Sequence, residues 1–160
     1  MNTNSKKPRR VLDATCGSRM MWFDQENHEA IYVDSRCETH ILCDGRSLNI
    51  APDIQMDFRK LDFADDTFNL IVFDPPHLIY AGEKSWLKLK YGKLELDWRQ
   101  DLKAGFAECF RVLKRDGVLI FKWNEGQIKS KEILALTQYR PLFGHPTGRK
   151  NLTHWFTFIK

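Results

Sequence analysis

Six short runs of aliphatic and β-branched residues are spaced along the chain, and they are the feature that most constrains its fold. They lie at 10–14, 30–33, 54–58, 69–74, 118–123 and 152–159. The runs show little strict alternation of apolar and polar residues, which is typical of strands in a sheet buried on both faces. Helical patterns lie between some of them, clearest at 101–113 and 128–137. Alternating strands and helices predict an α/β fold with a mostly parallel sheet.

The C-terminal segment 141–160 differs from the rest, because two apolar stretches flank the turn Pro146-Thr147-Gly148. This pattern predicts an antiparallel hairpin at the edge of the sheet. With 160 residues, 42% of them hydrophobic and 29% charged, the chain has the make-up of one globular domain. No repeat, linker or low-complexity tract divides it. We therefore expect a single domain over 10–160, preceded by a flexible basic arm over 1–9.

Composition narrows the class of protein. No stretch has the roughly 18 consecutive apolar residues of a membrane span, and the polar N-terminus has no apolar signal core. We therefore expect a cytoplasmic protein with no membrane partner. The four cysteines form no C-x-x-C pair and the histidines have no ligand spacing, so we expect free thiols and no metal site. A net charge of +4 permits a polyanionic partner without demanding one.

Three of the predicted strands end in an acidic residue. The first, Val11-Leu-Asp-Ala-Thr-Cys-Gly-Ser-Arg19, ends in Asp13 and a turn of small residues, which should lead into a helix over about 18–25. Asp34 closes the second strand, at the position from which a carboxylate binds both hydroxyls of a ribose. Asp57 closes the third and precedes Phe58, a pair that suits an adenine amino group and ring. Together the three carboxylates predict a nucleoside cofactor.

The strongest signal is the run Asn69-Leu-Ile-Val-Phe-Asp74-Pro75-Pro76-His77. Two prolines cannot continue a central strand, since neither donates a ladder hydrogen bond, so the chain must leave the sheet at Asp74 in a rigid, extended turn. There Asp74 and the carbonyl group of Pro75 offer two fixed acceptors to an amine, and His77 offers a flat side chain for stacking on a planar ring. The sequence therefore predicts a socket for an aromatic amino group.

With these motifs the chain resembles the class I S-adenosylmethionine-dependent methyltransferases, specifically the amino-methyltransferases with an Asp/Asn-Pro-Pro-aromatic motif. The resemblance covers roughly 10–125 and rests on Asp13-Ala-Thr-Cys-Gly17, Asp34, the stretch 56–71, Asp74-Pro-Pro-His77 and the stretch 111–120. It implies a Rossmann-like sheet of seven strands, mostly parallel, with an antiparallel C-terminal strand.

The resemblance also implies a cofactor and roles for individual residues. The cofactor would be S-adenosylmethionine (SAM), bound by Asp13, Ala14, Thr15, Cys16, Gly17, Arg19, Asp34, Ser35, Asp57, Phe58 and Asp74. The catalytic residues that hold the target amine would be Asp74, Pro75, Pro76 and His77.

The chain departs from the family pattern at two residues. Arg19 stands where a further glycine is usual, so either the turn is less tight or the guanidinium group reaches the cofactor carboxylate. His77 stands where Tyr, Phe or Trp is usual, and histidine titrates near neutrality. If His77 must be neutral to stack on a base, activity should fall below about pH 6.5.

The segment 78–99, directly after the socket, mixes cations with aromatic rings, as in sites that bind a phosphate backbone and unstacked bases. We expect this segment to supply the substrate-binding residues Lys84, Trp86, Lys88, Lys90, Tyr91 and Lys93, together with Asn124 at the end of a later strand. The alternative is a solvated lid whose aromatic residues pack on the core. Asn124 and Glu125 equally suit the cap of a helix. A base in a duplex would have to be flipped out, and a chain of this size has little surface to wrap a duplex. We therefore slightly favour RNA over DNA, or a single-stranded substrate, or a homodimer.

The sequence thus predicts a SAM-dependent methyltransferase that acts on an exocyclic amino group of a nucleobase, adenine first, in RNA or DNA. The same socket would hold the side-chain amide of a protein glutamine or a small-molecule amine. A third hypothesis, suggested by Arg19 and His77, is a non-catalytic cofactor-binding subunit of a partner methyltransferase. The intact Asp74-Pro75-Pro76 motif favours an enzyme.

Overall fold

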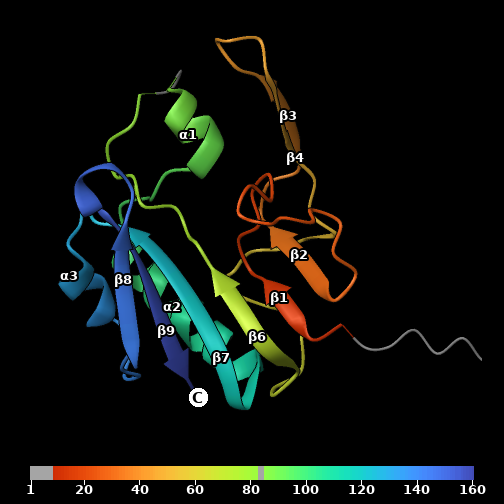
Figure 1. Ribbon diagram of the computed structural model, residues 1–160, viewed down its shortest axis with the longest axis vertical. Helices are drawn as coiled ribbons and strands as arrows, with labels where there is room; N and C mark the ends of the chain where they lie inside the picture. Colours follow the sequence, from red (N-terminus) through yellow and green to blue (C-terminus); the bar gives the residue numbers. More distant parts are fainter. Residues whose placement is uncertain (1–8, 83–84) are drawn as a thin grey trace, which may run out of the picture.

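The computed structural model describes residues 9–82 and 85–160. The strands of the main sheet are β1 (Val11–Asp13), β2 (Ala30–Asp34), β5 (Ile54–Gln55), β6 (Phe68–Phe73), β7 (Leu113–Asn124), β8 (Phe143–Thr147) and β9 (Thr153–Ile159). They form a seven-stranded sheet in the order β5-β2-β1-β6-β7-β9-β8 (Figure 1). The neighbouring strands β5, β2, β1, β6 and β7 pair in parallel, and β9 pairs antiparallel with both β7 and β8. The predicted Rossmann-like α/β fold with an antiparallel C-terminal hairpin is confirmed.

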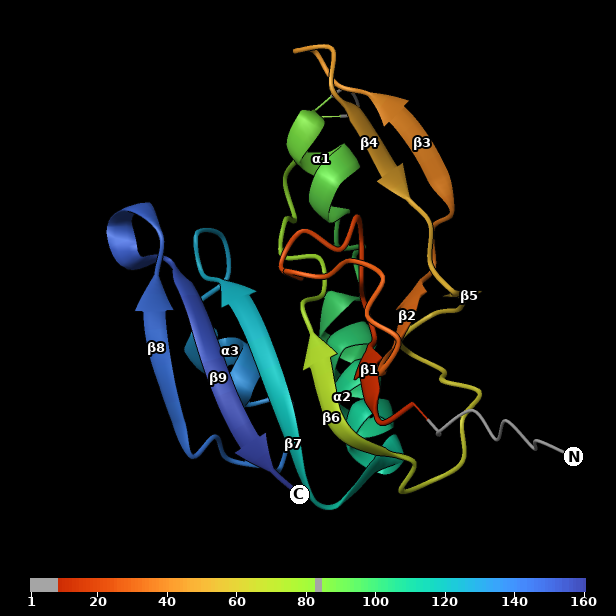
Figure 2. The same ribbon diagram turned by 45° about the vertical axis from the view of Figure 1, so that its right-hand side comes forward.

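Helices α2 (Trp98–Val112) and α3 (Ser130–Leu134) cover one face of this sheet (Figures 1 and 2). The apolar stripe that predicted α2 is buried, with every member at most 3% exposed: Leu102, Phe106, Cys109 and Phe110. Alternate residues of β7 pack on this side, each of them 0% exposed: Leu119, Phe121 and Trp123. Aromatic rings join the two layers, since the ring centres of Phe106 and Phe121 lie 4.9 Å apart. The core therefore sits between the helices and this face.

The remaining residues of β7 point to the opposite side of the sheet. There Val118, Ile120, Lys122 and Asn124 pair with Ile159, Thr157, Trp155 and Thr153 of β9. We call these eight residues the open face. All are partly or fully exposed, and none of the helices described lies over them (Figure 1). The prediction that both faces of every strand are buried is therefore wrong for β7 and β9.

Turns replace the helix that was predicted over 18–25. Gly17 and Arg19 have positive φ angles, of 52° and 56°, which a right-handed helix excludes. The Trp22 indole donates a hydrogen bond to Asp13, and its ring packs edge-on against Tyr32. These contacts hold the turns against the ends of β1 and β2, so the helix prediction is wrong.

A hairpin that the sequence did not predict lies between β2 and β5. Its strands β3 (Glu38–Ile41) and β4 (Ser47–Ile50) form a separate two-stranded sheet. The hairpin rises above the carboxyl ends of the main strands, as does the short helix α1 (Trp86–Tyr91) (Figure 2). The predicted strand over 54–58 is shorter, because only β5 pairs with β2. No described helix is both long enough and apolar enough to cross a membrane.

Candidate functional site

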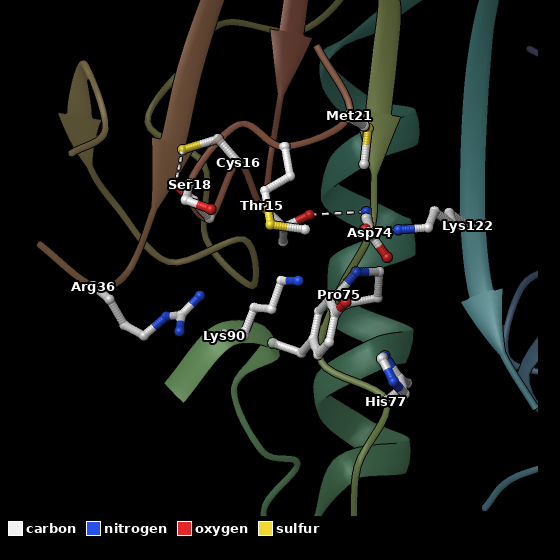
Figure 3. A pocket seen from close by; sticks show the side chains of 13 residues that line it. Thr15, Cys16, Ser18, Met21, Arg36, Asp74, Pro75, His77, Lys90 and Lys122 are labelled. Atoms are coloured by element: carbon white, nitrogen blue, oxygen red, sulfur yellow. Dashed lines mark hydrogen bonds and ion pairs between the residues drawn. The ribbon is translucent and has the colours of Figure 1, made fainter. Parts of the chain in front are cut away.

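Two cavities open at the carboxyl ends of β1, β6 and β7, and they have residues in common. The first has a volume of about 170 Å³ and is lined by Thr15, Cys16, Gly17, Ser18, Met20, Met21, Arg36, Asp74, Pro75, His77, Lys90, Tyr91 and Lys122 (Figure 3). The second has a volume of about 370 Å³ and is lined by Asp74, His77, Leu78, Leu87, Tyr91, Lys122, Asn124 and Thr153. We call the residues that line both the shared wall: Asp74, His77, Tyr91 and Lys122.

Residues of the loop after β1 line the first cavity. Gly17 adopts a φ of 52°, and its N–H donates to Asp34 Oδ2 over 2.9 Å. The Cys16 N–H donates to the carbonyl of Val33 over 2.8 Å. Burial raises the pKa of the Cys16 thiol to about 12, so this thiol is protonated at neutral pH. The loop is therefore tied to β2 through its backbone, and it places a neutral cysteine side chain at the cavity.

Asp13 supports this loop from below. Its buried carboxylate accepts hydrogen bonds from Trp22 Nε1, over 2.7 Å, and from the Thr15 N–H, over 3.2 Å. Burial raises the pKa of Asp13 to about 7, although both hydrogen bonds favour the ionised form. Asp13 lines none of the cavities described here, so the structure places it beneath the loop and away from the cavity surface.

Asp34 borders a narrower third cavity of about 40 Å³. This cavity is lined by Ala14, Thr15, Asp34, Ser35, Arg36, Phe58, Asp74, Pro76 and Tyr91. The Asp34 carboxylate accepts from Arg36 as well as from Gly17, with 3.1 Å between Arg36 Nε and Asp34 Oδ1. Arg36 in turn donates to the carbonyl of Leu89 in α1 over 3.0 Å. The end of β2 is thus tied to the segment that follows the two prolines.

Asp74 stands at the end of β6, where the chain leaves the sheet. Its N–H donates to Thr15 Oγ1 over 2.8 Å, which joins the Asp-Pro-Pro segment to the β1 loop (Figure 3). Lys122 of β7 points at Asp74, with 2.6 Å between Nζ and Oδ2. Burial raises the pKa of Asp74, and the Lys122 ammonium group opposes that rise. The carboxylate and the ammonium group therefore form an ion pair in the shared wall.

His77 is neutral at physiological pH. Burial, and then the nearby Lys122 charge, lower its pKa to about 4. Its ring centre lies 5.4 Å from that of Tyr91 and 6.3 Å from that of Trp123. The expectation of an acid limb near pH 6.5 is therefore wrong for His77, because a ring enclosed in this way protonates only at lower pH.

Two of the predicted cofactor residues are held elsewhere. The Arg19 guanidinium pairs with Asp53 over 3.0 Å and lies over the Tyr32 ring, on the side of the loop away from the first cavity. It therefore holds the turns in place and does not reach into the first or third cavity. The Asp57 carboxylate binds Arg59, which also pairs with Asp101 of α2. Asp57 thus lines none of the described cavities, whereas Phe58 does.

The segment predicted to bind substrate is only partly at the cavities. Lys90 and Tyr91 line the first cavity, and Lys90 Nζ lies 5.2 Å from the Tyr91 ring centre and 5.6 Å from that of Trp86. Trp86 is 46% exposed. Lys88 and Lys93 line neither cavity, and Lys84 lies outside the described residues. The structure thus brings one lysine and one tyrosine of this segment to the site.

Asn124 and Glu125 have separate surroundings at the end of β7. Asn124 lines the second cavity, donates to Thr153 Oγ1 over 3.0 Å and accepts from the Gly126 N–H over 3.0 Å. The Glu125 carboxylate accepts from the N–H of Ser130, the first residue of α3, over 3.2 Å. The interpretation as a helix cap therefore applies to Glu125, whereas Asn124 lies at a cavity.

The structure adds residues that sequence reasoning did not select. Lys122 is central to the shared wall, and Arg36 faces the first cavity from its other side, next to the predicted Lys90 (Figure 3). A lysine inside the apolar run 118–123 was a signal, because alternation along a strand puts it on the face opposite to Trp123. Arg36 had no comparable signal, since its role depends on the position of α1.

Solved structures share this fold at low sequence identity. A protein from Pyrococcus horikoshii OT3 matches with a TM-score of 0.60 and 17% identity, over 98% of this chain and 84% of that one. A TehB-like SAM-dependent methyltransferase from Corynebacterium glutamicum matches with a TM-score of 0.58 and 16% identity, over 96% and 81% of the two chains. A SAM-dependent methyltransferase from Methanosarcina mazei matches with a TM-score of 0.57 and 13% identity, over 94% and 92%.

The sequence itself gives no closer match. No model of a known protein family matches it, and no curated protein does. Identities of 13–17% establish a common architecture and leave activity to be argued from the site. The chain has the seven-stranded Rossmann-like fold that these SAM-dependent methyltransferases share.

Proposed function

We propose that the protein is a SAM-dependent methyltransferase that acts on an amino group. The observation that carries this proposal is the shared wall. A methyl donor in the first cavity and an acceptor in the second would meet at Asp74, the residue that follows β6. In open α/β sheets, ligands bind outside the carboxyl ends of the strands, where both cavities lie. Several solved proteins of this fold are SAM-dependent methyltransferases, which supports the same chemistry here.

The residues around the first and third cavities suit SAM. The backbone of Thr15 to Gly17 would lie along the methionine part, and Asp34 would bind the ribose hydroxyls at the end of β2. Phe58 would form an apolar wall for the adenine ring. Arg36 must turn away from Asp34 for the carboxylate to accept both hydroxyls, because it now donates to Oδ1. When bound, SAM supplies a sulfonium methyl group already activated for transfer.

The Asp-Pro-Pro segment would hold the acceptor amine. Among the described residues, Lys122 alone donates to the Asp74 carboxylate, on Oδ2, so the carboxylate keeps lone pairs that can accept from an amino group, together with the Pro75 carbonyl. Two rigid acceptors fix the direction of the nitrogen lone pair, which aligns it for in-line transfer. The carboxylate also stabilises the positive charge that develops on the nitrogen. Neutral His77 would offer its flat ring to the substrate.

For the substrate, we favour the exocyclic amino group of a nucleobase, adenine first, with RNA slightly ahead of DNA. Flat and apolar side chains in the second cavity suit a planar ring: His77, Leu78, Leu87 and Tyr91. Lys90 beside the Trp86 and Tyr91 rings suits a phosphate backbone with an unstacked base. A glutamine side-chain amide or a small amine would use the same acceptors without needing this segment.

The test is a methyl-transfer assay with the full chain. The protein is incubated with methyl-tritiated SAM and separate pools of ribosomal RNA, transfer RNA, single- and double-stranded DNA and unmodified cell protein. Digestion and mass spectrometry then identify the labelled group. We expect a methylamino base in a nucleic-acid pool. Label in protein alone contradicts the nucleobase proposal, and no label despite measured SAM binding contradicts catalysis by this chain.

Asp74→Ala supplies the matched test of mechanism. We expect turnover to fall by at least about 100-fold, as when one transition-state hydrogen-bonding group is removed, while SAM still binds. Asp44→Ala is the control, since Asp44 lies in the exposed β3–β4 turn and pairs only locally with Arg46. Because loss of Asp74 leaves Lys122 unpaired, the double variant Asp74→Ala, Lys122→Met separates misfolding from lost chemistry. Equal turnover in Asp74→Ala and the native protein would overturn the assignment.

A further inference from the structure

An acceptor and a donor stand side by side in the shared wall. Asp74 Oδ2 and Lys122 Nζ are 2.6 Å apart, and both side chains line both cavities. A carboxylate only accepts hydrogen bonds and an ammonium group only donates them. Their side chains are 17% and 24% exposed, so a ligand in the second cavity can reach both groups.

Each partner keeps hydrogen-bonding capacity after forming the ion pair. An ammonium group has three N–H donors, and the described contacts of Lys122 use one of them, on Asp74. On Asp74, neither Oδ1 nor the second lone pair of Oδ2 accepts from a described residue. Lys122 Nζ also lies 5.5 Å from the centre of the Trp155 ring on the neighbouring strand. The ion pair therefore has both a partner ring and unused hydrogen-bonding capacity.

A pair of this spacing matches a particular chemical edge. Where an amino nitrogen and a lone-pair nitrogen share one carbon atom, two C–N bonds of about 1.33 Å put the nitrogens roughly 2.3 Å apart. That spacing is close to the 2.6 Å between Asp74 Oδ2 and Lys122 Nζ, so two nearly parallel hydrogen bonds can form. The amino groups of adenine, cytosine and guanine each have such a ring nitrogen beside them. An alkylamine or an aniline has none.

We propose that Asp74 and Lys122 together recognise the amino–ring-nitrogen edge of an amino-bearing nucleobase, adenine first, with Lys122 donating to the ring nitrogen. The proposal rests on the proposed function and narrows its substrate to bases that carry this edge. Lys122 is therefore a substrate-binding residue that selects the base, whereas Asp74 binds the amine that reacts. A carboxamide shares the donor–acceptor pattern, but the flat walls His77 and Tyr91 favour a ring.

The test uses ligands that differ by single atoms. Dissociation constants are measured by calorimetry or NMR for adenosine, 1-deazaadenosine and purine riboside, in the presence of S-adenosylhomocysteine. We expect adenosine to bind about tenfold tighter than 1-deazaadenosine, because the latter leaves a charged donor without its acceptor. Cytidine and 3-deazacytidine form the parallel pair. N-acetylglutamine amide is the probe for a carboxamide occupant.

Substitutions of Lys122 test whether this side chain causes the difference in affinity between the members of each pair. Lys122→Met keeps the length and apolar stem of the side chain but removes the donor, and we expect it to bind both members of each pair equally. Lys122→Arg keeps a donor, and we expect it to restore part of the discrimination. The comparison in the native protein does not depend on the folding of any variant.

The outcomes separate this inference from the proposed function. If adenosine binds more tightly than purine riboside but no better than 1-deazaadenosine, the amine socket stands and the reading of the ring nitrogen by Lys122 is wrong. If purine riboside binds as well as adenosine, the amine socket itself is wrong. Binding of the carboxamide alone, or of no nucleoside up to its solubility limit, also overturns the proposal.

Discussion

One face of β7 packs in the core, and the other contributes residues to the candidate site. On the side of α2, residues 119, 121 and 123 are aromatic or aliphatic and 0% exposed. On the open face, Lys122 and Asn124 reach the cavities, and Ile120 is only partly buried. Because successive side chains of a strand point to opposite faces, one strand builds the core and the site with alternate residues. The comparison shows that residues of the core and residues of the candidate site alternate along β7, and do not lie in separate stretches of the chain.

The sharpest test of this separation compares adjacent residues of β7. We expect Leu119→Ala to lower the free energy of unfolding by about 3 kcal/mol or more, because a fully buried side chain leaves a cavity against α2. We expect Ile120→Ala, an isomeric truncation on the open face, to cost about 1 kcal/mol, because water already reaches that side chain. Urea unfolding measures both. Equal losses would mean that something covers the open face in solution.

A smaller effect is expected from added volume on the helix-covered face. A Cβ atom at Gly105 of α2 would lie 2.6 Å from the Phe58 ring and 2.8 Å from the Phe73 ring. We expect Gly105→Ala to cost about 1–3 kcal/mol by overpacking, and to weaken SAM binding through displacement of Phe58. Gly82→Ala is the control, since a Cβ there meets no atom within 4 Å. Thermal unfolding and SAM titration should both show the difference, and an unchanged Gly105→Ala protein would disprove the tight packing.

The smallest change is expected in the pH dependence of the native protein, because two buried groups oppose each other. His77 has a pKa of about 4 in the fold against an ordinary 6.5, so stability rises with pH over that window. Asp13 has a pKa of about 7 against an ordinary 3.8, so its contribution falls as pH rises over an overlapping window.

Removing either group should reveal the pH dependence of stability that the other group contributes. Between pH 4 and 7, we expect the free energy of unfolding of Asp13→Asn to rise with pH more steeply than that of the native protein. We expect His77→Gln to show the opposite difference, each with a slope change of at most about 1.4 kcal/mol per pH unit. Urea unfolding at several pH values measures both. Parallel profiles for all three proteins would show that neither group titrates as described.

The sequence predicted the parts of the fold that depend on local patterns. The apolar runs located the main strands, and the prolines after Asp74 marked where β6 ends. The helix over 18–25 was wrong because nothing local reveals that a non-glycine residue, Arg19, adopts a positive φ. The β3–β4 hairpin did carry a signal, the Asp44-Gly45 turn, that was not used.

The site was less predictable, because its properties depend on segments far apart in the chain. Asp34 and Asp74 could be placed from strand ends alone. The low pKa of His77 could not, since it results from burial beside Tyr91 and Trp123 and from the charge of Lys122. Arg19 and Asp57 lie outside the first and third cavities, in ion pairs whose partners cannot be read from spacing.

The shared wall also determines which positions are best suited to changing the substrate specificity. A substitution at any of its four residues alters both cavities at once, so under the proposed function a gain for a new substrate would bring a change in cofactor affinity. Besides Asn124, the residues Leu78, Leu87 and Thr153 line the second cavity and not the first. An engineer who wants a different acceptor from the same methyl donor should therefore build libraries at these three positions first.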